Sequence, residues 1–216
     1  MFSAAMRQFA FVLLSLLIPA AAIAQVNPVM GKDYTLLNPT QPTDSEGQVE
    51  VLEFFSYGCI HCFHLESALG AWEKKLPKDV KVKRVPTDFK IKGFDSRPVF
   101  YALEAMGMLD KLHYKLFEAF HKDNVTLGNP DVLAQWLARE GVDMKKYQEI
   151  EKSFSVQSKV NRARILQSSY KIEATPTLAL NGKYLIPSQE PALLFPLVDS
   201  LIATLRTGAK PPAGKS

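Results

Sequence analysis

The sequence predicts an α/β domain with a mixed β-sheet flanked by helices and an inserted all-helical segment. Three observations support this fold class. A strand-like segment at 48–55 runs directly into a helical pattern, and a second strand-like segment follows at 80–86. Roughly 85 residues of helical sequence then separate these elements from a hairpin at 175–187 and a last helix at 191–205. Without the helical block about 107 residues remain, which is a normal size for one small domain.

The first strand and helix meet at the only cysteines of the chain. Residues 48–55 are rich in β-branched and aromatic side chains, which is typical of a strand. After a break at 56–58, apolar residues recur at intervals of three and four, which predicts a helix that ends before Pro77. These residues are Cys62, Leu65, Leu69, Trp72 and Leu76. Cys59 therefore lies at the N-terminus of the predicted helix.

Helix caps divide the segment between 89 and 174. Asn129-Pro130 predicts a cap followed by a proline at the first helical position. Asp143 and Ser155 are expected to cap two further helices. The two apolar runs that follow are joined through Asn181-Gly182, a strong signal for a β-hairpin.

The first 24 residues are typical of a secretory signal peptide. Arg7 precedes an uncharged apolar run, and Ala22-Ile23-Ala24 supplies the small residues of a cleavage site. The apolar run is shorter than the roughly 20 residues of a membrane-spanning helix, so an uncleaved anchor is the second interpretation. We expect cleavage after Ala24 and export into an oxidising compartment.

Composition and charge give broad limits on the class of protein and on its binding partners. The chain has 26 Lys and Arg against 22 Asp and Glu, and 47% of its residues are hydrophobic. Loss of Arg7 with the signal peptide leaves a net charge of +3, spread along the chain. Such a distribution is typical of a solvated surface and does not indicate nucleic-acid binding. The apolar content is enough to form a core without cross-links.

Cys59 and Cys62 form a Cys-x-x-Cys motif. Exported proteins that are stabilised by disulfides usually carry several pairs between remote segments, and a loop this short would add little stability. Unpaired N–H groups and the positive end of a helix dipole lower the pKa of a cysteine at a helix N-terminus. We therefore predict a redox pair in which Cys59 is the nucleophile and Cys62 resolves the mixed disulfide. His61, between them, is expected to favour the thiolate of Cys59.

Other interpretations of the pair are weaker. Covalent c-type haem requires a histidine where this chain has Phe63, so that interpretation is excluded. A zinc site built from Cys59, Cys62 and His64 lacks a second cysteine pair and stays a minor alternative, as does a purely structural disulfide. We predict no metal and no cofactor. The remaining histidines are expected to be solvated or structural: His64, His113 and His121.

Glu53 is an acidic residue in an otherwise apolar pattern. It shares one face of the predicted strand with Val49, Val51 and Phe55, because alternate residues of a strand point to the same side. In a central strand its carboxyl group would be desolvated and its pKa raised, which makes it a candidate to accept or deliver the cysteine protons. In an edge strand it would face water. We favour the central position.

Taken together, the strand, the CIHC motif at a helix start and Thr175-Pro176 before a later strand resemble the thioredoxin fold. With the helical insertion, the export signal and the segment VLEFFSYGCIHCFHLE, the chain is identified as a member of the DsbA family of bacterial periplasmic thiol:disulfide oxidases. The resemblance implies a thioredoxin-like domain formed by 25–89 and 175–216, with 208–216 as a flexible tail. Residues 90–174 would form the inserted helical domain, after a signal peptide of 1–24.

The resemblance also implies roles for the site residues. Cys59 would be an exposed nucleophile and Cys62 a buried resolving cysteine, with His61 stabilising the Cys59 thiolate. Glu53 would be the buried acid beneath the pair.

A second part of the site is implied near the end of the chain. Thr175-Pro176 would form a cis-proline loop beside the disulfide, where the backbone of a substrate binds. The sequence alone also allows an ordinary trans Pro176 at a strand start, since cis bonds are a small minority of X-Pro bonds. Ile60 departs from the best-known members, which have proline there, and isoleucine cannot restrict the backbone as proline does.

The implied function is that of a periplasmic oxidase that donates its Cys59–Cys62 disulfide to reduced, unfolded exported proteins. A membrane quinone reductase resembling DsbB would restore the disulfide, and the protein would act as a monomer without nucleic acid. The alternatives are a disulfide reductase or isomerase, and a peptide-binding, chaperone-like module. Family isomerases carry an N-terminal dimerisation domain, whereas 34 residues separate the predicted cleavage site from Cys59. Binding that survives Cys59→Ser would favour the chaperone-like module.

Overall fold

The computed structural model describes residues 27–45, 47–91 and 93–208. The expected signal peptide and all but the first residue of the expected tail lie outside these ranges. The described strands are β1 (Thr35–Leu36), β2 (Val49–Phe55), β3 (Val80–Pro86), β4 (Thr177–Leu180) and β5 (Tyr184–Pro187). The described helices are α1 (Ile60–Glu73), α2 (Ser96–Ala105), α3 (Leu109–His121), α4 (Pro130–Arg139), α5 (Met144–Glu151), α6 (Phe154–Ser169) and α7 (Pro191–Thr207).

The five strands form one mixed sheet in the order β1-β5-β4-β2-β3. β2 and β3 are parallel, whereas β2 pairs with β4, β4 with β5 and β5 with β1 in the antiparallel sense. β2 therefore lies inside the sheet with a partner on each side. The parallel pair is joined through α1, as a crossover connection between parallel strands requires.

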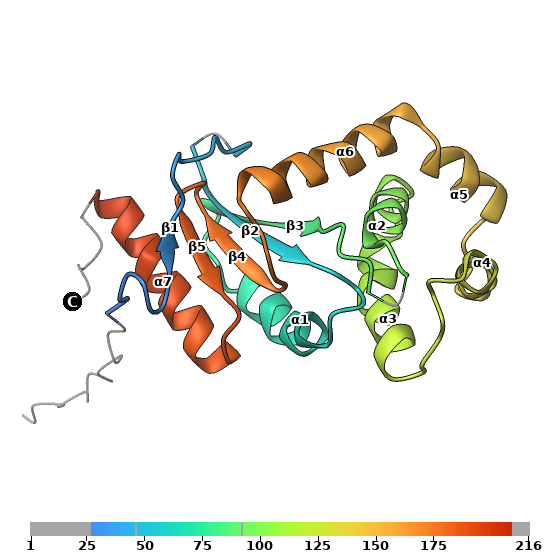
Figure 1. Ribbon diagram of the computed structural model, residues 1–216, viewed down its shortest axis with the longest axis horizontal. Helices are drawn as coiled ribbons and strands as arrows, with labels where there is room; N and C mark the ends of the chain where they lie inside the picture. The colour runs from blue at the N-terminus through green and yellow to red at the C-terminus, as the bar shows by residue number, and fades with distance from the viewer. Residues whose placement is uncertain (1–26, 46, 92, 209–216) are drawn as a thin grey trace, which may run out of the picture.

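Each face of the sheet has its own apolar core. The neighbours Val51 and Leu52 belong to different cores, because successive side chains of a strand point to opposite faces. Val51 packs with α1 and α7, whereas Leu52 packs against the side of α2, α3 and α6. At the end of β2 both Phe54 and Phe55 belong to this second core. Figure 1 shows α7 beside the sheet, α2 to α5 grouped beyond its other end, and α6 running from that group back toward the strands.

This architecture confirms the predicted fold class, a mixed sheet flanked by helices with a run of helices inserted between β3 and β4. The division into two domains at 89/90 and 174/175 stays a prediction. The β3 bounds and the Asn129 cap agree with the pattern of the sequence; the Asn129 side chain accepts from the N–H groups of Asp131 and Val132.

Some local predictions were wrong or incomplete. α6 is capped by Ser153, whose Oγ accepts from the N–H of Val156, and Ser155 lies inside the helix. The earlier start is favoured because an N-cap hydroxyl reaches the N–H two or three residues later. β1 was not predicted, since its two residues carry too little pattern to recognise. Its pairing with β5 is the reason that it is a strand.

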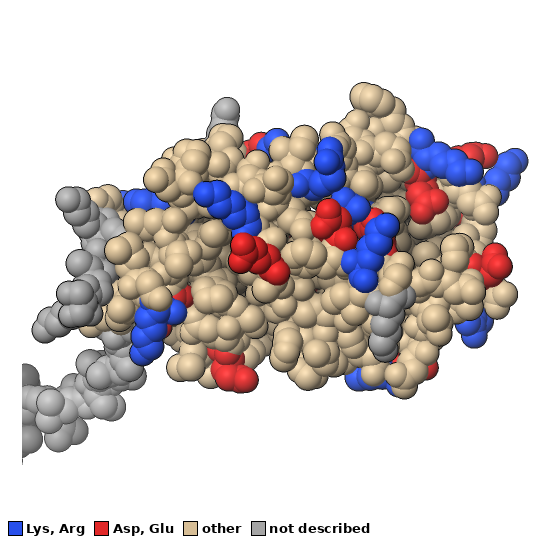
Figure 2. Space-filling view, viewed as in Figure 1, with Lys and Arg blue, Asp and Glu red and all other residues tan. Residues whose placement is uncertain are grey.

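The surface carries both charge signs. Figure 2 shows Lys and Arg interspersed with Asp and Glu on the face in view. Exposed ion pairs on the surface of the molecule include Arg162 with Asp44 and Arg206 with Asp79. None of the helices formed by the described residues has the length and apolar character needed to cross a membrane.

Candidate active site

The Cys-x-x-Cys motif lies where β2 passes into α1. The strand ends at Phe55, a short loop of 56–58 follows, and Cys59 is the N-cap of α1. Its Sγ accepts from the backbone N–H of Cys62 at 3.4 Å, so the sulfur takes the place of the side-chain oxygen in an ordinary cap. Both cysteines are free thiols, and the structure therefore represents the reduced state.

Both sulfurs are well covered, although to different degrees. Cys62 is 0% exposed and Cys59 is 7% exposed. The expectation that Cys59 is exposed was therefore wrong, because the nucleophile is largely buried. One reason is the loop before β4, since Sγ of Cys59 lies 3.2 Å from the carbonyl oxygen of Thr175, to which it donates in its protonated form.

The two cysteines have opposite pKa shifts. A hydrogen bond from the Cys62 thiol is the main cause that lowers the pKa of Cys59 to about 5; burial opposes it, and the Thr175 side chain and the N–H groups of Cys62 and His61 add to it. Burial raises the pKa of Cys62, and hydrogen bonding and charge from Cys59 raise it further. At neutral pH the reduced site therefore holds one thiolate on Cys59 and one thiol on Cys62.

The loop of Thr175 and Pro176 reaches the cysteines from the far end of the chain. The peptide bond between the two residues is cis, and β4 begins directly after it. The carbonyl oxygen of Thr175, which belongs to this peptide bond, is the acceptor for the Cys59 thiol. The structure therefore places this loop against the nucleophile, whereas its binding of a substrate backbone stays a prediction.

His61 contributes its backbone to the site. The N–H of His61 is one of the groups that lower the pKa of Cys59. Its side chain is exposed and lines a cavity of about 230 Å³ together with His64 and Glu190. Whether the imidazole also stabilises the thiolate stays a prediction, tested below. Ile60, next to it, is 41% exposed.

Glu53 lies in the interior of the sheet, as the central-strand interpretation requires. β2 pairs with β3 and β4 on its two sides, and the register places Glu53 opposite Arg84 and Leu178. The carboxyl group is 0% exposed, and neither oxygen has a hydrogen-bond partner among the described residues. Burial raises the pKa of Glu53 well above its ordinary value, and the charge of Glu66 raises it further, against the effect of Arg84.

Arg84 connects Glu53 to two acidic residues of α1. Its guanidinium lies 3.6 Å from Glu53, 2.8 Å from Glu66 and 3.0 Å from Glu73. Burial raises the pKa of Glu66, but contacts with His113 and Arg84 lower it below its ordinary value. Sequence reasoning predicted Glu53 as a buried acid but missed the other members of this charge cluster: Glu66, Glu73 and Arg84. Arg84 shares a strand face with the buried Val80 and Val82, which was the available signal.

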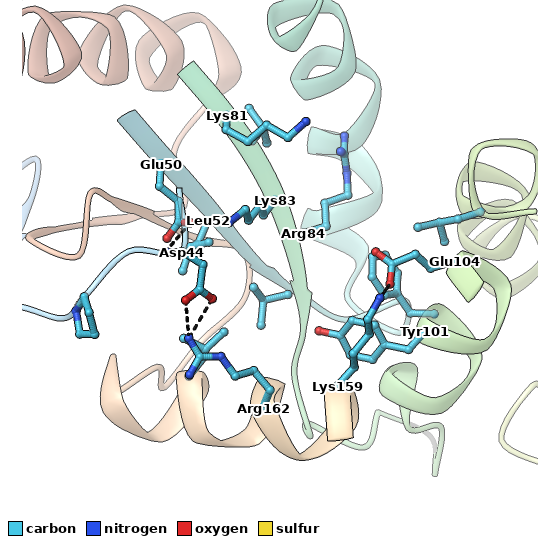
Figure 3. A pocket seen from close by; sticks show the side chains of 16 residues that line it. Asp44, Glu50, Leu52, Lys81, Lys83, Arg84, Tyr101, Glu104, Lys159 and Arg162 are labelled. Atoms are coloured by element: carbon cyan, nitrogen blue, oxygen red, sulfur yellow. Dashed lines mark hydrogen bonds and ion pairs between the residues drawn. The ribbon is translucent and has the colours of Figure 1, made fainter. Parts of the chain in front are cut away.

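A second cavity has no part in the redox site. Figure 3 shows a cavity of about 490 Å³ between the strands β2 and β3 and the helices α2 and α6. Each of its three acidic side chains pairs with a basic one: Asp44 with Arg162, Glu104 with Lys159 and Glu50 with Lys83. Neither cysteine lines it. Among residues 27–45, 47–91 and 93–208, no group of three or more His, Cys, Asp or Glu is arranged to hold a metal ion.

A low-pKa thiolate at a helix N-terminus, beside a buried thiol in this fold, defines the class of thiol:disulfide oxidoreductases that work through a dithiol pair. Residues 84–195 match the family described as "DSBA-like thioredoxin domain". The chain is 40% identical over 169 residues to the thiol:disulfide interchange protein DsbA of Burkholderia cepacia, covering 76% of this chain and 80% of that protein. It is also 35% identical over 183 residues to DsbA of Pseudomonas aeruginosa, covering 83% and 87% respectively. The chain belongs to the DsbA family.

Solved structures agree with this assignment. The crystal structure of Pseudomonas aeruginosa DsbA superimposes with a TM-score of 0.77 at 34% identity, covering 83% of this chain and 95% of that one. The oxidoreductase DsbA from Xylella fastidiosa gives a TM-score of 0.77 at 30% identity, covering 84% and 100%. The thioredoxin fold and the oxidoreductase class predicted from the sequence are thereby confirmed.

Proposed function

We propose that the protein is a thiol oxidase that donates the Cys59–Cys62 disulfide to reduced cysteines of newly exported, unfolded proteins. The observation that supports this direction of electron flow is Cys59 at the N-terminus of α1, where hydrogen bonds lower its pKa to about 5. A thiolate stabilised in this way favours the reduced enzyme. The disulfide form is correspondingly a strong oxidant.

In the first exchange, a thiolate of the client protein attacks Sγ of Cys59 in the oxidised enzyme. A bond forms between the two sulfurs, the Cys59–Cys62 bond breaks, and the Cys62 sulfur leaves with the electron pair. Because Cys62 is buried and its pKa is raised, that sulfur takes up a proton. We assign the delivery of this proton to Glu53, because burial raises its pKa and so favours the protonated carboxyl group.

In the second exchange, another thiolate of the client attacks the client sulfur of the mixed disulfide. Cys59 leaves as a thiolate, the client gains a disulfide, and the enzyme has accepted two electrons. A sulfur of low pKa is a good leaving group, so the groups that stabilise the Cys59 thiolate also speed this step. The backbone of the client would bind along Thr175 and Pro176, beside the exposed Ile60.

The remaining parts of the proposal concern the setting of the enzyme. A membrane quinone reductase resembling DsbB would reoxidise the dithiol, and the protein would act as a monomer in the periplasm after cleavage following Ala24. Residues 25–89 and 175–216 would form the redox domain, and 90–174 the helical domain. The periplasmic setting is supported by the kinship with DsbA proteins.

Titration of the Cys59 thiolate is the experiment that tests this function. We expect ultraviolet absorbance of the reduced mature protein to show half-titration near pH 5, because the site lowers the pKa of Cys59 to about 5. Equilibration with glutathione should give an oxidising potential on the same sample. A thiolate pKa near that of free cysteine with a reducing potential would assign the protein to the reductases instead.

The contribution of the His61 imidazole can be separated from that of its backbone. We expect His61→Ser to raise the pKa of Cys59 by about one unit, since the imidazole near the sulfur is lost as a hydrogen-bond donor or positive charge. The matched control is His64→Ser, one turn further along α1 and also exposed, which should leave the pKa unchanged. Equal pKa values in the parent and His61→Ser would mean that residue 61 acts through its N–H alone.

A further inference from the structure

Tyr57 lies in the loop before Cys59 and is held from two sides by α3. Its side chain is 0% exposed, and its hydroxyl lies 2.7 Å from Nδ1 of His113. Its backbone carbonyl oxygen lies 2.8 Å from Nε2 of His121. The two histidines are eight residues apart on α3, slightly more than two turns, and both contact Tyr57. Helix α3 of the insertion thus contacts both the side chain and the backbone of Tyr57.

The His113 end of this contact continues into the buried charge cluster. His113 is 8% exposed, and its Nε2 lies 3.3 Å from a carboxylate oxygen of Glu66, in a geometry poorly aligned for a hydrogen bond. Burial raises the pKa of Tyr57 well above its ordinary value, so the hydroxyl keeps its proton. A neutral imidazole that accepts this proton at Nδ1 carries its own on Nε2, toward Glu66. Rings of Phe55, Phe100 and Phe117 surround the imidazole.

The His121 end reaches both sides of the cysteine motif. A carbonyl oxygen only accepts hydrogen bonds, so Nε2 of His121 donates to Tyr57. The imidazole also stacks on Phe63, with ring centroids 5.4 Å apart and planes 9° apart. Phe63 follows Cys62 in the first turn of α1. His121 therefore contacts the loop that precedes Cys59. It also contacts the first turn of α1, whose N–H groups face the sulfur of Cys59.

The loop has little room to relax. A Cβ atom at Gly58 would lie 2.5 Å from Cβ of Ile91, so the backbone between Tyr57 and Cys59 is packed against a neighbouring segment. The N–H of Tyr57 donates to Oγ of Ser96 at 2.9 Å, the first residue of α2. Small changes at Tyr57 are thus transmitted to Cys59 rather than absorbed by a flexible turn.

We propose that His113 and His121 are positioning residues that hold Tyr57, and with it the backbone on both sides of Cys59, in the geometry that stabilises the Cys59 thiolate. This inference rests on the proposed function in one respect, because the thiolate is the leaving group of the oxidase. Stabilisation by N–H groups depends steeply on distance and angle, and the dipole of a helix acts only within its first turn. Helices of the insertion thereby influence the redox chemistry of the sheet domain.

Removal of single hydrogen bonds tests this assignment. Tyr57→Phe deletes only the hydroxyl, and His121→Leu deletes the donor to the carbonyl. In each variant we expect the pKa of Cys59 to rise. At a fixed pH below that pKa, the fraction of Cys59 present as thiolate should fall about three- to tenfold. The glutathione equilibrium should shift by a similar factor toward a less oxidising disulfide. His113→Gln retains an acceptor for Tyr57 and should rescue most of the shift seen in His113→Leu.

The control is Tyr34→Phe, which also removes a buried tyrosine hydroxyl but in the core between the sheet and α7. It should leave the pKa of Cys59 unchanged. Melting temperatures are measured for every variant. If Tyr57→Phe, His113→Leu and His121→Leu lower the melting temperature but leave the pKa of Cys59 at the parent value, the histidines are structural and the proposal is wrong. Should His113→Leu not fold, Tyr57→Phe and His113→Gln decide the question alone.

The parent protein separates this proposal from the proposed function. An ordinary Cys59 pKa in the parent would overturn the oxidase assignment before any variant is made. A low pKa in the parent that is insensitive to the loss of the Tyr57 hydroxyl and of both histidines would leave the oxidase assignment standing and overturn only the positioning role.

Discussion

Replacement of Cys59 by serine is expected to lower the rate of client oxidation by at least about a thousandfold, to the background of the assay. Cys62 cannot take over, because it is 0% exposed and its pKa is raised by burial and by the neighbouring sulfur. The measurement is the oxidation of a reduced model peptide with two cysteines, followed by fluorescence or mass. Activity that persists in Cys59→Ser would contradict the assigned mechanism.

Cys62→Ser is the matched variant, and it should fail in a different way. The Cys59 thiolate can still attack glutathione disulfide, which forms a Cys59–glutathione mixed disulfide and releases one glutathione thiolate. Without the second cysteine no internal thiol can resolve that bond, so the adduct should accumulate and be visible by mass spectrometry. The same adduct on Cys59→Ser, at Cys62, would reverse the roles of the two cysteines.

The local part of the site could be predicted from the sequence because it depends on neighbouring residues. Alternation in β2 and the spacing of three and four in α1 are set by the geometry of strands and helices, so they place Cys59 at a helix start without further information. Glu53 was found in the same way, as an acid on an apolar strand face. Its burial depended on β2 having a partner on each side, which only the assembled sheet shows.

The rest of the site could not be predicted because it depends on contacts between remote segments. Thr175 reaches Cys59 across 116 positions, and His113 reaches Tyr57 across 56. The sequence indicates that Arg84 shares a face with apolar residues, but only the register of the parallel strands places it opposite Glu53. The helix pattern around His113 and His121 favoured structural roles, since spacing alone does not show which loop a helix will contact.

Replacement of Arg84 by methionine is expected to lower the free energy of unfolding by about 3–5 kcal/mol at pH 7, the usual cost of removing one partner of a buried ion pair. The guanidinium is 17% exposed and serves two carboxylates that are 0% and 8% exposed, on Glu53 and Glu66. Methionine keeps much of the apolar stem but none of the charge. Urea unfolding of the reduced protein, followed by circular dichroism, measures the change.

The pH dependence of this loss identifies its cause. Without Arg84 the folded-state pKa of Glu53 rises further above its unfolded value, and the pKa of Glu66 loses part of its lowering, because a positive charge that lowers both is gone. An acid whose pKa is higher in the folded state than in the unfolded state does not destabilise the fold at a pH below its unfolded-state pKa. As the pH rises from there toward the folded-state pKa, the acid lowers the free energy of unfolding more and more. The deficit of Arg84→Met should therefore be smallest near pH 4 and grow toward pH 7.

Two further variants exclude loss of packing as the explanation. Arg206→Met removes an arginine from an exposed pair with Asp79, 41% and 50% exposed, and should cost less than about 1 kcal/mol. Glu53→Gln combined with Arg84→Met removes the fully buried acid whose pKa is raised, and it should restore part of the stability at pH 7 but little at pH 4. A deficit of equal size at both pH values, with no gain from Glu53→Gln, would show that the Arg84 stem rather than its charge stabilises the site.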